Sequence, residues 1–481
     1  MRNFSSMNIL LLAGVVPAMQ SCAESAPTKS ASAEKPNVIV VLCDDLGSYD
    51  VGFGGCKDIP TPNIDRIAHE GINCTDAKIS APYSGPSRCG LLTGRYQQRF
   101  GAEGNTEDHS ESVDQKQGVP TTETMMPEAF KAAGYKTAVI GKWHAGDNET
   151  MTPNARGADY FYGMTGGGFS FWGIPAPKAP TVTIMENDRN VPASEVNYLT
   201  DDFTDKALDF IDKNADENFM IYLAYNAPHA PMQAPQKYLD RTTHIFDPWR
   251  TIYAAMVLAV DDGVGKVWAK LEEKGIADNT IIIFLSDNGG TNRAYNIPRR
   301  AYKGNMFDGG ISTPFAIYWK NGGLTGGKVY DKTISSLDIF PTVAAAAGID
   351  SKSFKNPLDG VDLMPYWMGE KRDAPHKALF WRVCGGMEYA ARMGDYKIVK
   401  RYHSDDLMLF NIAKDPIEMY DIAAENPAKV KELAVAYDKW NSEMMTPRWE
   451  DKHAPHQIED YENWTKARKR ALRPQPKKNK K

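Results

Sequence analysis

The sequence predicts an α/β protein in which a mostly parallel sheet lies between layers of helices. Continuous runs of apolar, often β-branched residues alternate along the chain with helix patterns. Runs without polar alternation are typical of strands that are buried on both faces of a parallel sheet. Several runs end directly in polar clusters, which indicates candidate ligand-binding side chains at the carboxyl edge of that sheet. A length of 481 residues suits one large domain with a smaller one.

The strand and helix patterns can be placed in order along the chain. The apolar runs that predict strands lie at residues 37–43, 137–140, 219–224, 280–285 and 315–318. The clearest helix pattern lies before the fourth run, since apolar side chains at spacings of three and four form one stripe that ends near Gly275. These side chains are Tyr253, Met256, Val257, Val260, Val264 and Val267. Polar clusters follow three of the strands, at residues 44–45, 141–144 and 286–288.

The pattern changes after about residue 370. Residues 377–399 hold shorter strand patterns with glycine turns, and residues 427–444 form a helix pattern. We therefore expect a main domain over residues 36–370 and a smaller C-terminal α+β subdomain with an antiparallel sheet over residues 371–465.

The first 35 residues are typical of an export signal and a tether. Residues 7–19 form a short apolar run that is followed by small residues and a cysteine. We expect residues 1–21 to be a lipoprotein-type signal peptide and Cys22 to be the acylated first residue, with ordinary cleavage near Ala23 as the alternative. Residues 22–35 would then be a flexible tether. The sequence thus predicts an exported protein, periplasmic or anchored in the outer membrane of a Gram-negative bacterium, that contacts the membrane only through an N-terminal lipid.

Charge is distributed unevenly along the chain. The net charge is −5, but residues 466–481 carry nine Lys and Arg and no acidic residue, so the remaining chain holds 47 basic and 61 acidic residues. This acidic body excludes the basic surface that general nucleic-acid binding requires. An anionic substrate would therefore need a local cluster of cations. We expect the basic tail over residues 466–481 to be disordered and solvated, with contact to an anionic polysaccharide or membrane surface as the alternative.

Residues 84–95 contain the first candidate catalytic group. Pro86 suits the first turn of a helix and Gly94 suits its C-terminal stop, so we expect one short helix with Ser84 just before it. A side chain at that place meets free backbone N–H groups and the positive end of the helix dipole, and Arg88 adds a cation one turn along. Ser84 could thus be an oxygen nucleophile beside a site for negative charge. Taken alone, the same position also suits a plain helix N-cap serine.

The residues from Ser84 to Arg95 match, position by position, the signature [Cys/Ser]-x-Pro-Ser-Arg-x-x-x-Leu-x-Gly-Arg of the formylglycine-dependent sulfatases. Further segments in the family's order are residues 41–47 (VLCDDLG), 61–65 (TPNID), 141–146 (GKWHAG), 227–231 (APHAP), 285–289 (LSDNG), Lys303 and 307–310 (FDGG). From residue 36 to about residue 425, the chain is therefore identified as a member of the type I sulfatases of the alkaline phosphatase superfamily. The resemblance implies an alkaline-phosphatase-like α/β fold and hydrolysis of sulfate esters, with residues 36–370 as the catalytic domain.

Two positions depart from the commoner family pattern. Residues 308–314 read DGGISTP where the family usually has Glu-Gly-Gly-x-Arg-Val-Pro, and we expect the missing arginine to be structural. The nucleophile position holds Ser84 instead of cysteine. In this family that residue is oxidised to Cα-formylglycine (3-oxoalanine), whose hydrate is the nucleophile. The serine form implies that a radical maturase of the anaerobic type acts on Ser84 before export.

The resemblance also implies a metal site at two strand ends. Asp44, Asp45, Asp287 and Asn288 supply only oxygen ligands, which suits a hard cation, and the family implies one Ca²⁺ per chain that also contacts the modified Ser84. An isolated Asp-Asp pair is more often a solvated loop, but here two acidic strand ends match one family site. The cation would neutralise charge on the sulfate and help to ionise the nucleophilic hydroxyl.

The family implies roles for five further side chains. Arg88 would secure the nucleophile, and Lys142 and Lys303 would bind the sulfate, which gives the acidic body the local cations that it needs. His229 would act as the general acid that protonates the leaving alcohol. His144 would then deprotonate the second hydroxyl of the sulfated hydrate, so that sulfate leaves and the aldehyde is restored.

The resemblance points to a sulfated oligo- or polysaccharide as the substrate. A serine-type lipoprotein sulfatase resembles those of bacteria that degrade sulfated polysaccharides or host glycans, and residues 96–101 also resemble bacterial carbohydrate sulfatases. Specificity is expected from loops at residues 102–118, 164–173 and 291–300 and from the C-terminal subdomain. Candidate substrate-binding residues in these parts are Trp172, Arg293, Arg299, Arg300 and His403.

Two other functions fit part of the same pattern. A phosphate or phosphonate ester hydrolase of the same superfamily would use unmodified Ser84, although a two-metal phosphatase needs additional His and Asp ligands. A lipoprotein that only captures sulfated glycans would result if Ser84 is never matured. Retention of every expected catalytic position favours the sulfatase.

Overall fold

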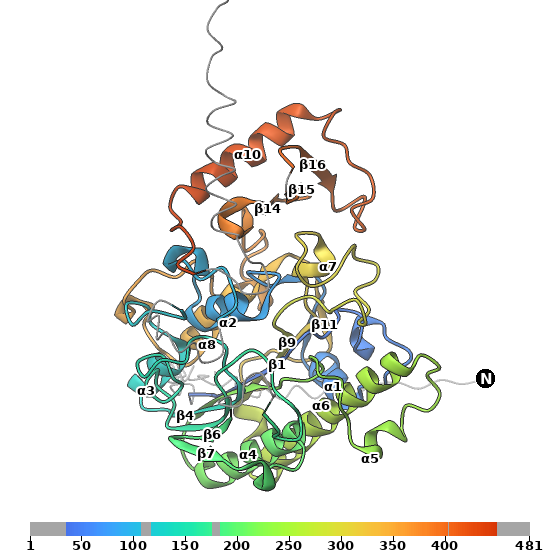
Figure 1. The fold of residues 1–481 in the computed structure, drawn as a ribbon. Coiled ribbons are helices and arrows are strands. Elements are labelled where there is room, and N and C mark those ends of the chain that lie inside the picture. The colour runs from blue at the N-terminus through green and yellow to red at the C-terminus, as the bar shows by residue number, and fades with distance from the viewer. Residues whose placement is uncertain (1–34, 107–116, 176–182, 403, 450–481) are drawn as a thin grey trace, which may run out of the picture. The chain divides into compact units, whose positions relative to one another are not determined.

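The computed structural model describes residues 35–106, 117–175, 183–402 and 404–449 (Figure 1). The predicted signal peptide, Cys22, His403 and the basic tail lie outside these residues. Among the described residues, no helix is both long enough and apolar enough to cross a membrane.

A ten-stranded sheet forms the centre of the fold. In spatial order its strands are β11 (Lys328–Tyr330), β2 (Ile72–Cys74), β10 (Phe315–Tyr318), β9 (Thr280–Ser286), β1 (Asn37–Cys43), β8 (Phe219–Ala224), β4 (Lys136–Lys142), β5 (Tyr160–Met164), β6 (Ile184–Glu186) and β7 (Arg189–Val191). The five strands from β9 to β5 are parallel, whereas β10, β6 and β7 are each antiparallel to their inner neighbour. The mostly parallel α/β fold predicted from the sequence is confirmed.

Strand β10 departs from the direction that its apolar sequence suggested. The sequence analysis placed residues 315–318 with the buried runs of a parallel sheet, but β10 runs antiparallel to β9. The reason lies in the connection over residues 287–314, which leaves β9 at its carboxyl end and returns into the sheet at that same edge. A connection of this kind reverses the chain direction, and it keeps a long segment beside the candidate site.

Helices cover both faces of the sheet. Side chains of β1 alternate between two cores: Ile39 and Val41 pack with one set of helices, and Val38, Val40 and Leu42 pack with the other. The first set is α1 (Pro62–Glu70), α4 (Leu199–Asn214) and α6 (Pro248–Glu273), and the second is α2 (Ser84–Thr93), α3 (Met126–Ala132) and α8 (Ile339–Ala346). Burial on both faces explains why the strand sequences do not alternate with polar residues.

Short elements complete the main part of the fold. β3 (Ala77–Lys78) and β12 (Ile334–Ser335) pair as a separate two-stranded sheet. The remaining short helices are α5 (Gln236–Leu239), α7 (Asp308–Ile311) and α9 (Met364–Trp367). Of these, α7 lies in the connection between β9 and β10, so it belongs to the segment that borders the candidate site.

The C-terminal part contains a four-stranded antiparallel sheet and one helix, as predicted. Its elements are β13 (Leu379–Val383), β14 (Glu388–Met393), β15 (Tyr396–Lys400), β16 (Leu407–Asn411) and α10 (Pro427–Asn441). The sequence analysis did not identify β16, and it extended the helix three residues too far. One face of the sheet packs on α10, and the other packs on Met306, Phe307 and Ile311 next to α7.

A buried chain of charges joins this sheet to the main part of the fold. Nζ of Lys78 lies 2.6 Å from Oδ2 of Asp308 and 2.8 Å from Oγ of Ser312. Nζ of Lys397, on β15, lies 2.6 Å from Asp308 and 2.7 Å from Glu418. Burial alone would raise the pKa of Asp308, but Lys397 and Lys78 hold it well below its usual range. Ser312 stands where the family pattern has arginine, so two lysines from elsewhere in the chain supply the positive charge here.

We expect the Lys397→Met variant to be strongly destabilised. The substitution leaves Glu418 buried without its cation, a change that costs roughly 3–5 kcal/mol in proteins. The urea midpoint, followed by tryptophan fluorescence, should fall accordingly. Lys431→Met, on the exposed side of α10, is the matched control and should change the unfolding free energy by less than about 0.5 kcal/mol. Equal midpoints for the two variants would show that the charge chain does not hold the C-terminal sheet in place.

Candidate active site

Four oxygen-bearing side chains meet at the carboxyl edge of the sheet. Asp44 and Asp45 follow β1, and Asp287 and Asn288 follow β9. The last residues of these two strands pair in parallel register, so their following residues necessarily lie side by side. All four side chains are at most 2% exposed. The structure therefore brings together the set that the sequence predicted as metal ligands.

Helix α2 places Ser84 against this set. Ser84 is the first residue of the helix, not the residue before it, because the extended backbone ends at Tyr83. Oγ of Ser84 lies 3.0 Å from Oδ1 of Asp44 and 3.0 Å from Oδ1 of Asn288. The backbone N–H of Gly85 donates to the side chain of Asn105 at 3.0 Å. Sequence reasoning missed Asn105, since nothing in its own segment marked it as a helix-capping partner.

Two fully buried cations lie behind the carboxylates. The guanidinium of Arg88 contacts Oδ2 of Asp287 through Nε at 2.9 Å and through Nη2 at 2.8 Å. Its Nη1 donates to the backbone oxygen of Lys142 at 2.9 Å, which links α2 to the end of β4. Nζ of Lys142 donates to Oδ2 of Asp44 at 2.6 Å. Arg88 and Lys142 thus orient the acidic groups as well as offsetting their charge.

A third cation comes from the connection between β9 and β10. Nζ of Lys303 lies 2.6 Å from Oδ1 of Asp45, and its side chain is 19% exposed. Its backbone N–H donates to Gly290, and the next N–H, of Gly304, donates to Pro82 just before the nucleophile helix. The loop that carries Lys303 is therefore fixed to both neighbouring segments of the site.

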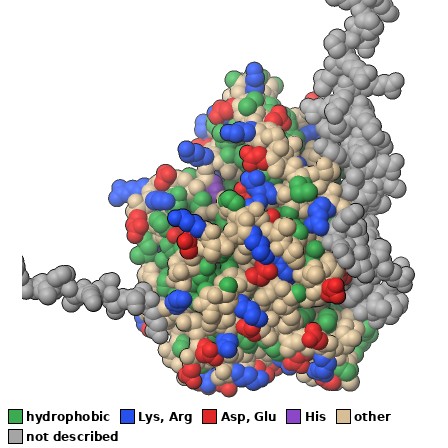
Figure 2. Space-filling view, turned by 90° about the vertical axis from the view of Figure 1, so that its left-hand side faces the viewer, with side chains coloured by type: hydrophobic (Ala, Val, Ile, Leu, Met, Phe, Trp, Pro, Cys, Tyr) green, Lys and Arg blue, Asp and Glu red, His purple; other side chains and the backbone are tan. Residues whose placement is uncertain are grey.

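The cations of the candidate site are concentrated around its carboxylates. On the face drawn in Figure 2, Lys and Arg side chains are interspersed with Asp and Glu side chains over the coloured residues. The cluster of Arg88, Lys142 and Lys303 instead gathers three positive charges around one group of carboxylates. This arrangement agrees with the expectation that an acidic protein needs a local cluster to handle an anion.

The two predicted histidines differ in their surroundings. His144 follows β4, is 4% exposed and adopts a positive φ of 54°. Burial, together with Lys142, Arg88 and Lys303, holds the pKa of His144 well below its usual range. Among the described residues, none forms a hydrogen bond with its buried Nδ1. His144 is therefore an uncharged ring at neutral pH.

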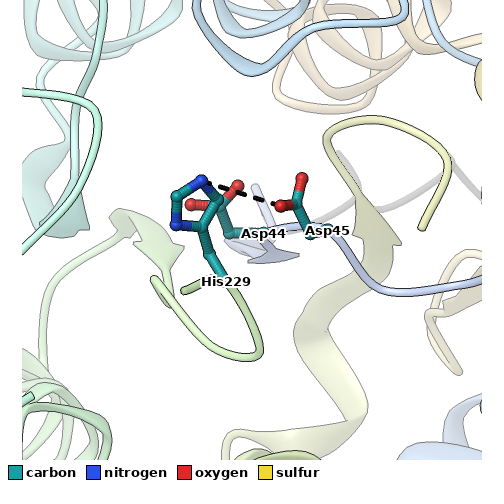
Figure 3. Close-up of side chains that lie close together, drawn as sticks. All are labelled: Asp44, Asp45 and His229. Atoms are coloured by element: carbon teal, nitrogen blue, oxygen red, sulfur yellow. Dashed lines mark ion pairs between the residues drawn. The ribbon is translucent and has the colours of Figure 1, made fainter. Parts of the chain in front are cut away.

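His229 is half-buried and lies beside the carboxylates. It follows β8, and its Nε2 lies 3.6 Å from Oδ2 of Asp45 (Figure 3). Its Nδ1 lies 2.6 Å from the backbone oxygen of Ala230. A carbonyl oxygen only accepts, so Nδ1 carries a proton and Nε2 is the ring atom that can exchange a proton with a ligand.

The acidic groups remain ionised at neutral pH. Burial raises the pKa of Asp44, but Lys142, His229 and Arg88 oppose it and lower the pKa to about 2. Burial also raises the pKa of Asp45, and Lys303 and His229 lower it below its usual value. Burial in turn lowers the pKa of Lys142, although Asp44 opposes this shift.

The donor atoms fit a hard divalent cation. Asp44, Asp45 and His229 each offer a ligand atom, and these atoms lie within 4.8 Å of one another (Figure 3). Asp287 and Asn288 add oxygen atoms from the adjacent strand end. Carboxylate and amide oxygens of this number are typical of a calcium or magnesium site, whereas zinc sites favour histidine and cysteine. The residues of this chain are therefore compatible with the metal that the sequence analysis expected.

A glycine-rich loop covers both histidines. A Cβ atom at Gly167 would lie 2.8 Å from Cε1 and Nε2 of His144, and one at Gly168 would lie 3.6 Å from Cε1 of His229. From the sequence, residues 164–173 were expected to contribute to specificity, but these contacts with the histidines were not foreseen. Trp172, at the end of the loop, is 36% exposed. At Gly167 the loop leaves room for the imidazole of His144 only because this position lacks a side chain.

The other candidate substrate-binding residues differ in whether the protein itself occupies their hydrogen-bond donors. Arg299 and Arg300 donate to oxygen atoms of the protein itself. Arg293 is exposed and lies with its guanidinium 4.2 Å from the ring centre of Trp249. His403 is outside the described residues. Arg293 and Trp172 are thus the candidates with substantial exposed surface.

Comparison with known proteins agrees with the geometry of the site. The model of the family described as Sulfatase matches residues 36–349. The chain belongs to the sulfatase family. This sulfatase is a sulfuric ester hydrolase, and its fold is that of the alkaline phosphatase superfamily.

Named relatives match over most of this sulfatase. It is 31% identical over 503 residues to the uncharacterized sulfatase YdeN of Escherichia coli (strain K12), covering 85% of each chain. It is 30% identical over 441 residues to the N-acetylgalactosamine-6-sulfatase of Homo sapiens, covering 82% of this chain and 83% of that protein. The crystal structure of Ps i-CgsB in complex with k-i-k-neocarrahexaose matches with a TM-score of 0.81 and 35% identity, covering 92% of this chain and 98% of that chain.

We expect Gly167→Ala to reduce turnover by about tenfold or more, because the new methyl group must displace the imidazole of His144. Gly168→Ala is the matched control, since its Cβ meets His229 at an ordinary contact distance. Steady-state sulfate release and thermal unfolding should be measured for both. Similar kcat values for the two variants, or a large loss of stability in Gly167→Ala alone, would contradict a specific role in positioning His144.

Proposed function

We propose that this sulfatase releases inorganic sulfate from O-sulfated glycans, with a formylglycine derived from Ser84 and one bound Ca²⁺. One observation carries the proposal: the Ser84 hydroxyl lies 3.0 Å from both Asp44 and Asn288, in a cluster of buried carboxylates that three cations surround. These contacts support a single site that would combine an oxygen nucleophile, oxygen ligands for a metal ion and positively charged side chains for an anion.

The metal would be held by Asp44, Asp45, Asp287 and Asn288. Formylglycine at position 84 would supply a hydroxyl nucleophile through its hydrate, and Ca²⁺ would supply positive charge beside the sulfate oxygens. The chain's own part is to keep the ligands ionised and oriented. Lys142 and Lys303 do this for the two adjacent carboxylates, at 2.6 Å each.

The same lysines would bind the sulfate group. Sulfate ester cleavage resembles phosphoryl transfer, in which positioning and charge stabilisation supply most of the rate enhancement. Arg88 is fully committed to Asp287 and to the backbone of Lys142, so its part is to hold the nucleophile helix against the metal site. Lys303 is the most accessible of the three cations and is the one best able to move onto a sulfate oxygen.

The two histidines would divide the proton transfers between them. His229 is the half-exposed ring, and its Nε2 would give a proton to the leaving alcohol oxygen, which is a poor leaving group without it. His144 is the buried, neutral ring, and it would accept a different proton, from a hydroxyl that the modified Ser84 supplies.

The substrate class is supported by relatives and by the surface near the site. The structure that is 35% identical over 92% of this chain was solved in complex with k-i-k-neocarrahexaose, an oligosaccharide. A human relative acts as an N-acetylgalactosamine-6-sulfatase. In this chain, Arg293 and Trp172 offer exposed cationic and aromatic surface that suits a sulfated sugar.

The proposal includes a partner and a location. A radical maturase would oxidise Ser84 before export, and the lipid on Cys22 would then anchor the protein at the periplasmic side of a membrane. The N-terminal sequence pattern and the serine at position 84 are the support for both statements.

We expect protein that is coexpressed with an anaerobic-type maturase to lose about 2 Da in the peptide that contains Ser84, the mass of two hydrogens, and to release sulfate from sulfated glycans. Peptide mass spectrometry and ion chromatography of the released anion are the measurements. Ser84→Ala, coexpressed in the same way, should show the peptide mass calculated from its own sequence, without the loss of two hydrogens. It should release no sulfate.

Two outcomes would replace the proposal. Turnover of phosphate esters by protein with unmodified Ser84 would assign it to the phosphate or phosphonate ester hydrolases. Protein that binds sulfated glycans but whose Ser84 is left unmodified by the maturase would be a glycan-binding lipoprotein.

We expect metal removal to abolish sulfate release, because three buried carboxylates would otherwise repel a sulfate group. Exhaustive dialysis with EGTA should remove about one calcium ion per chain, as measured by elemental mass spectrometry. Ca²⁺ should restore both the metal content and the activity. Asp45→Asn should retain less metal in the same dialysis without chelator. Full activity in a metal-free preparation would contradict the calcium assignment.

A further inference from the structure

The loop after the metal-binding strand end is held rigidly beside the site. This loop, residues 291–297, is separated from Asn288 by two glycines, Gly289 and Gly290. The backbone N–H of Tyr295 donates to Asp50 at 2.9 Å, and its carbonyl accepts from Tyr49 at 3.0 Å. A Cβ at Gly47, two residues after Asp45, would lie 2.5 Å from the backbone oxygen of Tyr295. The loop is therefore in contact with the segment that carries the predicted metal ligands.

Tyr295 presents a fixed aromatic ring on this loop. Its ring is stacked on the guanidinium of Arg250 at 3.9 Å, while 42% of the residue is exposed. Arg250 is 3% exposed and lies 2.7 Å from Asp50 and 2.9 Å from Asp58. Since the buried arginine occupies one side of the ring, the exposed surface is the opposite side.

Helix α6 and the loop each carry one more exposed group: helix α6 carries the ring of Trp249, and the loop carries the cation Arg293. Trp249 precedes Arg250 in the first turn of α6 and is 49% exposed. The guanidinium of Arg293 lies 4.2 Å from the ring centre of Trp249. Among the described residues, Arg293 has no acidic partner, so its N–H groups are available to an anion. Arginine stacked on an aromatic ring in this way keeps its donors in the plane of the guanidinium.

We propose that Trp249, Arg293 and Tyr295 form a subsite for a sugar unit of the glycan chain beyond the one that loses its sulfate. The aromatic rings would pack on the apolar faces of pyranose rings, and Arg293 would bind a sulfate or carboxylate on the same chain. This inference rests on the proposed function and deepens it, since it assigns the enzyme to oligomeric or polymeric glycans instead of sulfated monosaccharides.

Charge favours a polyanionic glycan as the occupant of this surface. Arg293 offers an anion-binding group, and Trp249 and Tyr295 offer stacking surfaces, within one loop and one helix turn. Among the described residues no acidic side chain pairs with Arg293, so a sulfate or carboxylate of the glycan would meet a charge that the protein has not already neutralised.

The test compares binding and turnover in the full-length protein. Affinity electrophoresis through gels that contain carrageenan, chondroitin sulfate, fucoidan or heparin measures binding of the polymer, with unmodified wild type, Trp249→Ala and Arg293→Gln. Val329→Ala, which shortens a side chain that is 67% exposed on the edge strand β11, is the control. We expect at least one polymer to retard wild type and the control, and each subsite variant to bind that polymer about tenfold more weakly.

Turnover of 4-nitrophenyl sulfate by the matured proteins separates this proposal from the proposed function. Trp249→Ala should hydrolyse this small ester at the wild-type rate and lose kcat/KM, through KM, only on the retarding polymer. Equal retardation of wild type and both variants, or no retardation of wild type by any polymer, would overturn the subsite. Normal polymer binding by a matured wild type that releases no sulfate would instead overturn the proposed function.

Discussion

The rest of this structure depends on one constraint, which is the burial of three neighbouring carboxylates, Asp44, Asp45 and Asp287. Buried like charges repel one another, and each requires a cation or a hydrogen-bond donor nearby. Arg88 compensates Asp287, Lys142 compensates Asp44, and Lys303 compensates Asp45. These three cations come from a helix, a strand end and a long loop. The charge balance of the site therefore ties together the main parts of the α/β fold.

The proposed catalysis would add a bound cation and a sulfate group to this arrangement. Each lysine that pairs with a carboxylate is also within the site that would receive a sulfate, so positive charge is already desolvated there and needs little rearrangement. The connection between β9 and β10 stays at the carboxyl edge, which is why β10 is antiparallel and why Lys303 can reach Asp45. Fold topology and active-site chemistry are thus two consequences of one long loop.

The sequence predicted the parts of the molecule that depend on local patterns. Buried apolar runs located β1, β4, β8, β9 and β10, and the signature from Ser84 to Arg95 located α2 and the candidate nucleophile Ser84. It could not show that Lys78 and Lys397 would meet at Asp308, since a lysine in a strand pattern looks the same whether it is buried or solvated. The contact of Gly167 with His144 and the stacking of Arg293 on Trp249 were equally hidden, because tertiary packing alone brings these segments together.

The central claim is that catalysis depends on oxidation of Ser84 within this charge cluster. The most direct measurement prepares the protein with graded coexpression of the maturase and plots the initial rate of sulfate release against the fraction of Ser84 converted, determined by peptide mass. The account predicts a straight line through the origin. A rate that is independent of the converted fraction, or that remains finite when no Ser84 is converted, would contradict it.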